Sequence, residues 1–281
     1  MGHRETTSTL AAAAQVALLA ALVLLHGLGP LGLLAGAAYG AVLLVLLTGA
    51  MRRAGRSSFG PADLVTLGRA LLVGGVTALV VDGLVTGVTA TLPLVVCASV
   101  ALALDAVDGQ VARRTGTVSK VGARFDMEVD AFLILVLSVH VAGLVGRWAL
   151  TIGAMRYAFV AAGWALPWLR GSLPASYATK AVAALQGVVL VAAVVVAHPL
   201  AVVLVAVGLA LLCWSFGRDA LHLWTGRAER NIELIASAVR MMHVTTRRVA
   251  VCVPTRRRDV SDVGLRRARR RHADVRHPAP R

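Results

Sequence analysis

Five acidic residues fall within one short window of the chain, from Asp105 to Asp130. Asp105 and Asp108 are three residues apart, and Asp126 and Asp130 are four apart, so each pair shares one face of a helix. Glu128 lies between the members of the second pair and points away from their face. The pairs stand at the facing ends of two strongly apolar stretches, where an acidic side chain is costly and marks a functional site by default.

The chemistry that these four carboxylates favour is the binding of divalent cations. Residues 114–121 form a short connection that brings the two helices back antiparallel, with the acidic pairs facing each other. Four carboxylates held together repel, and some would have to take up protons. Two divalent cations would balance the charge, and all-oxygen ligands favour Mg²⁺ or Mn²⁺ over zinc. Such a pair of cations is typical of phosphoryl-transfer sites.

The residues between the acidic pairs suit a nucleotide. Gly109 and Gly122 lack side chains where a nucleotide or the partner helix would approach closely. Arg113 follows Gly109 by about one turn and can reach a phosphate.

The stretch 105–130 resembles the signature of the CDP-alcohol phosphatidyltransferases, D-x-x-D-G-x-x-A-R-x8-G-x3-D-x3-D, at every fixed position. The resemblance covers about residues 60–225 and implies the six-helix core of that family. It implies that Asp105, Asp108 and Asp126 hold two divalent cations, Mg²⁺ or Mn²⁺. Asp130 would lie at their edge as a further ligand and as the general base. The resemblance also implies a homodimer.

An upstream segment extends the resemblance. The family often has Asn-x-x-Thr-x-x-Arg where this chain has Asp63, Thr66 and Arg69. Asp63 replaces the asparagine and would also suit the N-cap of a helix. The resemblance implies that Asp63 and Arg69 contact the donor. The residues that it implies for the CDP site are Thr66, Gly109, Ala112, Arg113 and Gly122.

The implied reaction joins an alcohol to a substituted phosphate from a CDP-linked donor, with release of CMP, in phospholipid biosynthesis. The donor is either a CDP-linked lipid such as CDP-diacylglycerol or a CDP-linked headgroup. Met127 and Ala131 stand where phosphatidylglycerophosphate synthases typically have proline and lysine, which argues against glycerol phosphate as the acceptor. Arg156 lies in the middle of an apolar stretch. Our hypothesis is that Arg156, with Arg170 or Lys180, binds an anionic acceptor such as a polyol phosphate. The alternative is that Arg156 pairs with an acid or extends to the membrane interface.

The elements that position these residues are membrane helices. The chain is 58% hydrophobic and 15% charged, with a mean hydropathy of +0.76, which indicates the bilayer as its solvent. Membrane-spanning segments that lack the alternating pattern of β-strands must be helical. The sequence therefore predicts an all-α polytopic membrane protein. Its six-helix core is preceded by an N-terminal hairpin of two helices. The first apolar stretch could also be a signal peptide. The eight predicted spans are 10–27, 31–50, 64–86, 92–112, 124–146, 149–169, 179–197 and 199–222.

Basic residues gather in alternate connections and in the C-terminal tail, which predicts that the carboxylate site and both termini are cytoplasmic, in a bacterial-type plasma membrane. The predicted domains are a hairpin with a basic linker (1–58), a catalytic core (59–225) and a basic tail (226–281). Residues 227–246 predict an amphipathic surface helix, and the chain from Thr255 predicts disorder. The charge of the tail favours anionic lipid over nucleic acid as its partner.

Two other functions fit part of the pattern. Buried carboxylates also mark the pathways of cation transporters, although these need no glycine-arginine pattern between the acidic pairs. A non-catalytic relative that organises the membrane is the second alternative, but the chain retains every aspartate of the signature.

Overall fold

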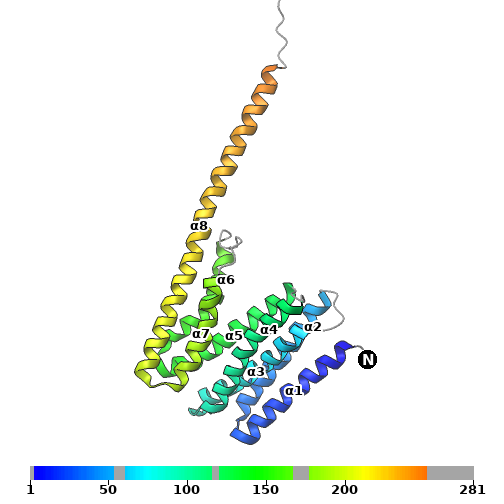
Figure 1. The fold of residues 1–281 in the computed structure, drawn as a ribbon, viewed down its shortest axis with the longest axis vertical. Helices are drawn as coiled ribbons and strands as arrows, with labels where there is room; N and C mark the ends of the chain where they lie inside the picture. The colour runs from blue at the N-terminus through cyan, green and yellow to red at the C-terminus, as the bar shows by residue number, and fades with distance from the viewer. Residues whose placement is uncertain (1–2, 54–60, 116–119, 167–176, 252–281) are drawn as a thin grey trace, which may run out of the picture. The chain divides into compact units, whose positions relative to one another are not determined.

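The computed structural model describes residues 3–53, 61–115, 120–166 and 177–251, and within them all regular structure is helical (Figure 1). This confirms the predicted all-α class. The helices are α1 (His3–His26), α2 (Pro30–Arg53), α3 (Pro61–Thr86), α4 (Thr91–Thr115), α5 (Lys120–Val145), the 3₁₀ turn η1 (Arg147–Ala149), α6 (Leu150–Ala165), α7 (Tyr177–Val195) and α8 (His198–Val251).

Five of the described helices contain segments that are long and apolar enough to cross a membrane. These segments are Ser8–His26, Pro30–Gly49, Leu64–Thr86, Arg124–Val145 and His198–Thr225. The helices α4 and α7 contain the shorter apolar segments Thr91–Val107 and Ala181–Val195. The apolar part of α4 is short because the polar residues of the acidic signature begin before the helix ends.

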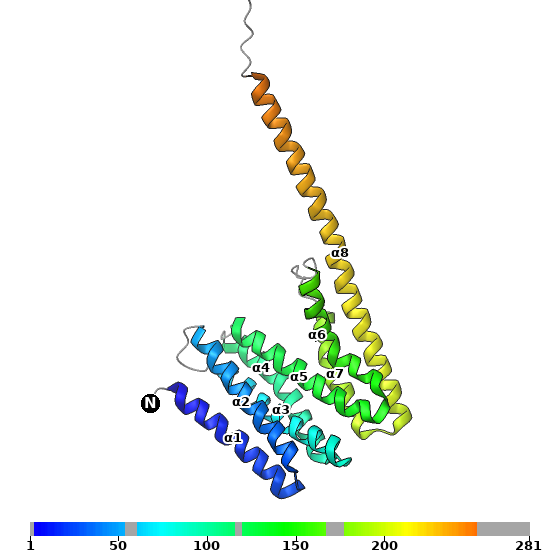
Figure 2. The ribbon, with the colours of Figure 1, turned by 180° about the vertical axis from the view of Figure 1, so that it is seen from behind.

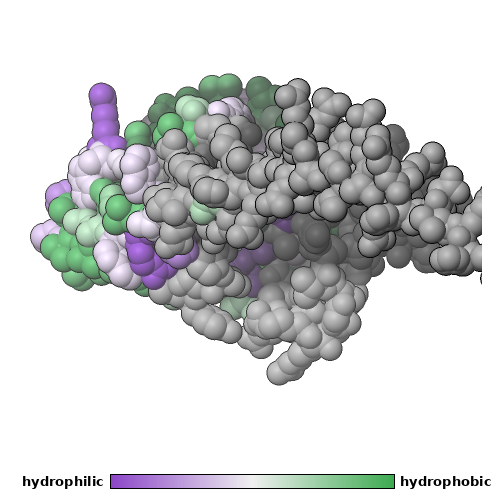
Figure 3. Space-filling model, turned by 90° about the horizontal axis from the view of Figure 1, so that it is seen from above, coloured by the Kyte–Doolittle hydropathy of each residue, from purple (hydrophilic) through white to green (hydrophobic). Residues whose placement is uncertain are grey.

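The outer surface of these helices is apolar, as expected of a protein embedded in lipid. Leu24 and Leu25 on α1 are 84% and 76% exposed, and Trp164 on α6 is 74% exposed. Figure 3 shows that apolar and hydrophilic residues both occur on the described surface. Large apolar side chains without a protein partner are accounted for by acyl chains around them.

A tight turn joins α1 to α2. Gly27 has a positive φ of 68°, and its amide bonds the Val23 carbonyl at 3.0 Å, so the left-handed glycine ends α1. Pro30 then opens α2, where its fixed φ favours a helix and its missing amide proton costs nothing. The predicted hairpin of two helices is therefore confirmed.

The hairpin packs closely on α3, which lies beside it in both ribbon views (Figures 1 and 2). A Cβ atom at Gly32 would lie 2.7 Å from the backbone oxygen of Ala78, and one at Gly36 would lie 3.0 Å from the Ala78 side chain. At the far end of the helices, the Gly29 amide donates to the Asp82 carboxylate at 2.9 Å. Close approach through glycine is how membrane helices gain packing contacts without a hydrophobic driving force.

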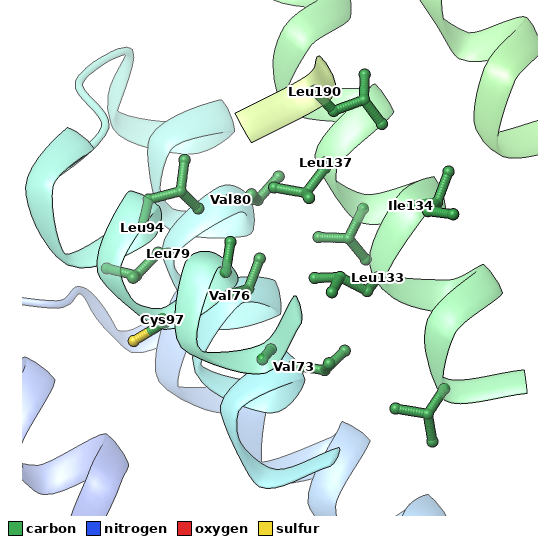
Figure 4. Close-up of a cluster of buried hydrophobic side chains, with 14 of the residues drawn as sticks. Val73, Val76, Leu79, Val80, Leu94, Cys97, Leu133, Ile134, Leu137 and Leu190 are labelled. Carbon is green, nitrogen blue, oxygen red and sulfur yellow. The ribbon is translucent and has the colours of Figure 1, made fainter. Parts of the chain in front are cut away.

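The core lies between α3, α4 and α5. Val73, Val76 and Val80 of α3 point toward Leu133 and Leu137 of α5 (Figure 4). Side chains of α4 and α7 close the same cluster, among them Leu94 and Leu190. These residues recur every three or four positions, so each helix presents one buried stripe to the others.

The chain divides into two compact units, Met1–Thr225 and Gly226–Arg281. In the second unit, the segment 227–246, for which we predicted an amphipathic helix, is helical and belongs to α8. The segment from Thr255 lies outside the described residues.

Candidate active site

The acidic residues lie on the same stripes that build the core. On α4, Leu94, Ala98 and Ala101 are fully buried, and Asp105 follows Ala101 by four residues on that face. Alanines at these positions allow neighbouring helices to approach closely. The stripe therefore delivers Asp105 to the helix interface at the end of α4.

Helix α5 carries its acidic residues in the same way. Leu133, Leu137 and Val141 are at most 1% exposed, and Asp126 and Asp130 precede them on that face of the helix. Both aspartates are partly buried. The packing that places the leucines in the core thus directs the Asp126 carboxylate toward Arg69 on α3.

Arg69 on α3 joins the two acidic helices. Its side chain is only 1% exposed and forms ion pairs with the carboxylates of Asp105 and Asp126. One guanidinium nitrogen, Nη2, also donates to the backbone oxygen of Asp126 at 2.9 Å. A buried arginine needs such partners, because an uncompensated charge in a low-dielectric site is very costly. Arg69 therefore links α3 to both acidic helices and offsets part of their negative charge.

The carboxylates remain accessible. The side chains of Asp105 and Asp126 are 34% and 33% exposed, so each can bind Arg69 and still present an oxygen to a ligand. Among the described side chains, no three His, Cys, Asp or Glu residues form a metal-binding group, and the side chain of Asp108 lies outside that set. The carboxylates of Asp105 and Asp126 converge on the Arg69 guanidinium and offer only oxygen atoms as ligands. Oxygen ligands of this kind fit a hard divalent ion.

The remaining predicted residues fall on the same three helices. Thr66 is buried on α3, one turn before Arg69, and Gly122 is partly buried in the first turn of α5. Several others lie in helices but outside the described side chains, namely Asp63 on α3, Asp108, Gly109, Ala112 and Arg113 on α4, and Lys180 on α7. Arg170 lies outside the described residues.

Arg156 on α6 pairs with Glu128 on α5, with 2.6 Å between Nη2 and Oε1. Gly153 makes this contact possible, because a Cβ there would lie 2.5 Å from the Cα of Leu135. The glycine lets α6 approach α5 one turn before Arg156. The side chains of Arg156 and Glu128 are 33% and 53% exposed.

Two features of this site escaped the sequence analysis. The predicted site leaves out Glu128 because it points away from the face that carries the aspartates. In the structure Glu128 is the acidic partner of Arg156, as the alternative interpretation of Arg156 required. Arg69 was assigned only a donor contact, whereas it also bridges two of the aspartates. A charged residue on the mostly apolar face of α3 was the available sign of such a partner.

A family model agrees with this arrangement. Residues 59–214, more than half of the chain, match the model of the CDP-alcohol phosphatidyltransferase family, which confirms the resemblance seen in the signature. The match begins at the start of α3 and leaves α1 and α2 outside. No curated protein and no solved structure shows a significant match to the chain. The chain therefore belongs to the CDP-alcohol phosphatidyltransferase family, transferases that move a phosphate group from a CDP-linked donor to an alcohol.

Proposed function

We propose that this protein transfers a phosphatidyl group from a CDP-linked lipid to a small anionic alcohol and releases CMP, as a step of phospholipid biosynthesis. The observation that carries the proposal is the convergence of Arg69, Asp105 and Asp126 at the ends of three packed helices. Phosphoryl transfer depends on positioning and charge compensation more than on covalent chemistry. A rigid, charged junction of three helices supplies both.

Asp130 is the general base in this proposal. It follows Asp126 by one turn on α5 and is partly buried, so it is held near the acidic junction by the core itself. Its carboxylate takes the proton from the acceptor hydroxyl, and the acceptor oxygen forms a bond to the β-phosphorus of the donor. The bond between that phosphorus and the oxygen of CMP breaks, and CMP leaves with the electron pair.

The residues that would hold two divalent cations, Mg²⁺ or Mn²⁺, are Asp105, Asp108, Asp126 and Asp130. When bound, the cations would neutralise the charge on the phosphates. Thr66, Gly109, Ala112 and Gly122 would line the CDP site. Arg113 would meet the negative charge of the departing CMP, and Asp63 and Arg69 are further candidates for contacts to the donor.

Arg156 remains the candidate for acceptor binding, together with Arg170 or Lys180. Its ion pair with Glu128 is partly exposed. Pairs of this kind contribute only about 0.2–1 kcal/mol, so a phosphate on the acceptor could replace the Glu128 carboxylate at little cost. A phosphate also offers Arg156 several acceptor oxygens, which favours a polyol phosphate over a neutral alcohol.

A cation pathway fits the geometry less well than transfer does. Arg69 contributes a fixed positive charge between two of the carboxylates that a passing cation would have to use. The bridge ties both carboxylates to one fixed partner, which suits a site with resident ligands better than a pathway whose ligands must take up and release ions in turn. The same bridge suits a site that binds the negative phosphates of a nucleotide.

Location and assembly complete the proposal. The basic connections favour a cytoplasmic position for the carboxylate site and both termini in a bacterial-type cell, where a water-soluble nucleotide has access. The bilayer supplies the lipid donor, and the family resemblance favours a homodimer.

The test measures CMP release from CDP-diacylglycerol by the purified protein with Mg²⁺ or Mn²⁺. The acceptors to compare are glycerol phosphate, inositol phosphate, serine and other alcohols. We expect release that depends on one acceptor, preferentially a polyol phosphate. CDP-linked headgroups with diacylglycerol as the acceptor form a second arm, and activity there alone would overturn the choice of a lipid donor.

Matched variants make the assay specific. Asp130→Asn should lower turnover at least 1,000-fold, because an amide cannot accept the proton. Asp82→Asn, which changes an acid at the opposite end of α3 and retains an oxygen for the Gly29 amide, should leave turnover unchanged. Equal activity of the Asp130→Asn protein and the unmodified protein would exclude Asp130 as the base, and inactivity with every donor would favour a non-catalytic role.

A further inference from the structure

Among the described contacts between the N-terminal hairpin and the core, one aromatic side chain, Tyr39 on α2, reaches both α3 and α5. Tyr39 on α2 lies against α3, where a Cβ at Gly74 would be 2.9 Å from Cδ1 of the ring. Glycine at this position removes the side chain that would otherwise hold α2 away. The fixed packing of Gly32 and Gly36 on α3 keeps the tyrosine in place.

The same ring reaches α5. Tyr39 stacks on Phe132, with the ring centroids 5.2 Å apart and an angle of 23° between their planes. Offset stacking at this separation is a favourable geometry for aromatic pairs. Tyr39 therefore contacts the helix that carries Asp126 and Asp130 as well as the helix that carries Arg69.

Both contacts lie one to two helical turns from the ion pairs. Gly74 follows Arg69 by five residues, and Phe132 follows Asp126 by six and Asp130 by two. At 1.5 Å per residue the separations from Arg69 and Asp126 are about 7.5 Å and 9 Å along the helix axes. The ring thus packs on both helices beneath the layer in which Arg69 meets Asp126.

We propose that Tyr39 is a positioning residue for the transferase site: its ring, stacked on Phe132 and seated against Gly74, sets the spacing of α3 and α5 and thereby holds Arg69 and Asp130 in register. The inference rests on the proposed function. It gives the N-terminal hairpin a part in catalysis, through a contact that none of the family-matched residues supplies. Sites that act by positioning lose rate when a helix shifts by about 1 Å.

Both contacts are made by the ring, so the ring and not the hydroxyl is expected to matter. In the full-length protein, Tyr39→Leu should lower kcat for CMP release at least tenfold, while KM for the lipid donor changes less than threefold. Tyr39→Phe should keep kcat within threefold of the unmodified protein. The matched control is Leu43→Ala, a buried position one turn further along α2, which should lose packing but keep kcat within threefold.

A second variant approaches the contact from the other side. Phe132→Leu removes the same stack, so Phe132→Leu combined with Tyr39→Leu should have about the kcat of either single variant. Three results would overturn the inference: kcat of Tyr39→Leu within threefold of the unmodified protein, losses that multiply in the double variant, or equal losses in Tyr39→Phe and Tyr39→Leu.

An activity-independent measurement separates this inference from the proposed function. Mn²⁺ should raise the unfolding temperature of the unmodified and Tyr39→Phe proteins in detergent, and the rise should be smaller in Tyr39→Leu. Equal rises in all three proteins would contradict the positioning role. Unmodified protein without CMP release would instead count against the proposed function, and the Mn²⁺ comparison would still decide the role of Tyr39.

Discussion

Arg69 is the residue on which the charge balance of the site depends. It is the charged residue in a buried stripe of α3 whose other polar members are Thr66 and Thr77, and it is almost wholly buried. Attraction between unit charges grows as the local dielectric falls, so its two ion pairs are stronger than they would be in water. The partial exposure of both aspartates moderates that gain. The arrangement holds two carboxylates near each other before any cation or nucleotide arrives.

Replacing Arg69 by glutamine should therefore cost both stability and activity. Loss of one member of a buried ion pair typically costs about 3–5 kcal/mol, and exposure of the aspartates places the expected value near the lower end. We expect turnover to fall at least 100-fold. Arg69→Lys should be intermediate, because one ammonium group cannot reproduce the planar fork that meets two partners. Thermal unfolding in detergent measures the first effect, and a Gln variant as stable as the unmodified protein would contradict it.

Arg156 gives a different kind of prediction, because its partner is exposed. Arg156→Ala should raise KM for an anionic acceptor about 10- to 100-fold, the loss expected from one charge-assisted contact, with little change in KM for the lipid donor. Glu128→Gln, which keeps the size of the side chain, should leave acceptor KM unchanged or lower it. Steady-state kinetics with both substrates varied would separate these effects, and an unchanged acceptor KM in Arg156→Ala would remove Arg156 from the binding site.

The sequence predicted the aspartates well and their partners poorly. Spacing alone places Asp126 and Asp130 on one helix face, because helical periodicity is a local property. The bridge from Arg69 to Asp105 depends on how three helices pack, and no spacing within one helix encodes that. Glu128 shows the same limit, since its face follows from periodicity but its partner on α6 does not.

At the scale of elements, the hairpin is held to α3 by close contacts at glycine and alanine as well as by buried leucines such as Leu19 and Leu22. Lipid solvates leucine as well as a neighbouring helix does, so association depends on close contact of backbones. Gly32 and Gly36 on α2 meet Gly74 and Ala78 on α3. Buried Gln15 of α1, whose amide nitrogen donates to the Gly36 carbonyl at 3.4 Å, adds a polar contact between the two helices of the hairpin.

Gly32→Ala tests this packing directly. Its Cβ would lie 2.7 Å from a backbone oxygen that cannot move independently, so the two helices must separate. We expect a loss of about 1–3 kcal/mol, typical of overpacking. Gly49→Ala on the same helix is the matched control: its Cβ meets nothing within 4 Å, so the higher helix propensity of alanine should make it neutral or slightly stabilising. Equal unfolding temperatures for the two variants in detergent would show that the close contact of Gly32 with Ala78 does not contribute to stability.

Most element boundaries could be predicted because they coincide with turn chemistry. Gly27 and Pro30 mark the hairpin turn in the sequence as they do in the structure. The end of α8 could not be predicted in this way. We predicted an amphipathic helix over 227–246, and the chain is helical there and as far as Val251. A single glycine at 226 does not stop a helix, and the next proline, Pro254, comes only after it has ended.

At the scale of the whole molecule, function depends on which side of the membrane the acidic junction faces. Five described helices are suited to span the bilayer by length and composition, but neither property fixes orientation. The distribution of basic residues predicts the orientation, because positively charged connections tend to be retained in the cytoplasm. Arg113, Arg114, Lys120 and Arg124 flank the connection between α4 and α5, whereas the connection between α3 and α4 has no basic residue.

Orientation is therefore the last prediction, and it can be tested with single cysteines. We expect Val88→Cys, in the connection between α3 and α4, to react with a membrane-impermeant maleimide in intact spheroplasts, and Ser119→Cys to react only after permeabilisation. Native Cys252 is replaced by serine in both proteins, while Cys97 and Cys213 lie within the apolar parts of α4 and α8. Labelling of Ser119→Cys in intact cells would place the aspartates outside, away from cytoplasmic CDP-linked donors. In that case the proposed reaction would lack its substrate, because a charged nucleotide headgroup does not cross the apolar interior of the bilayer unaided.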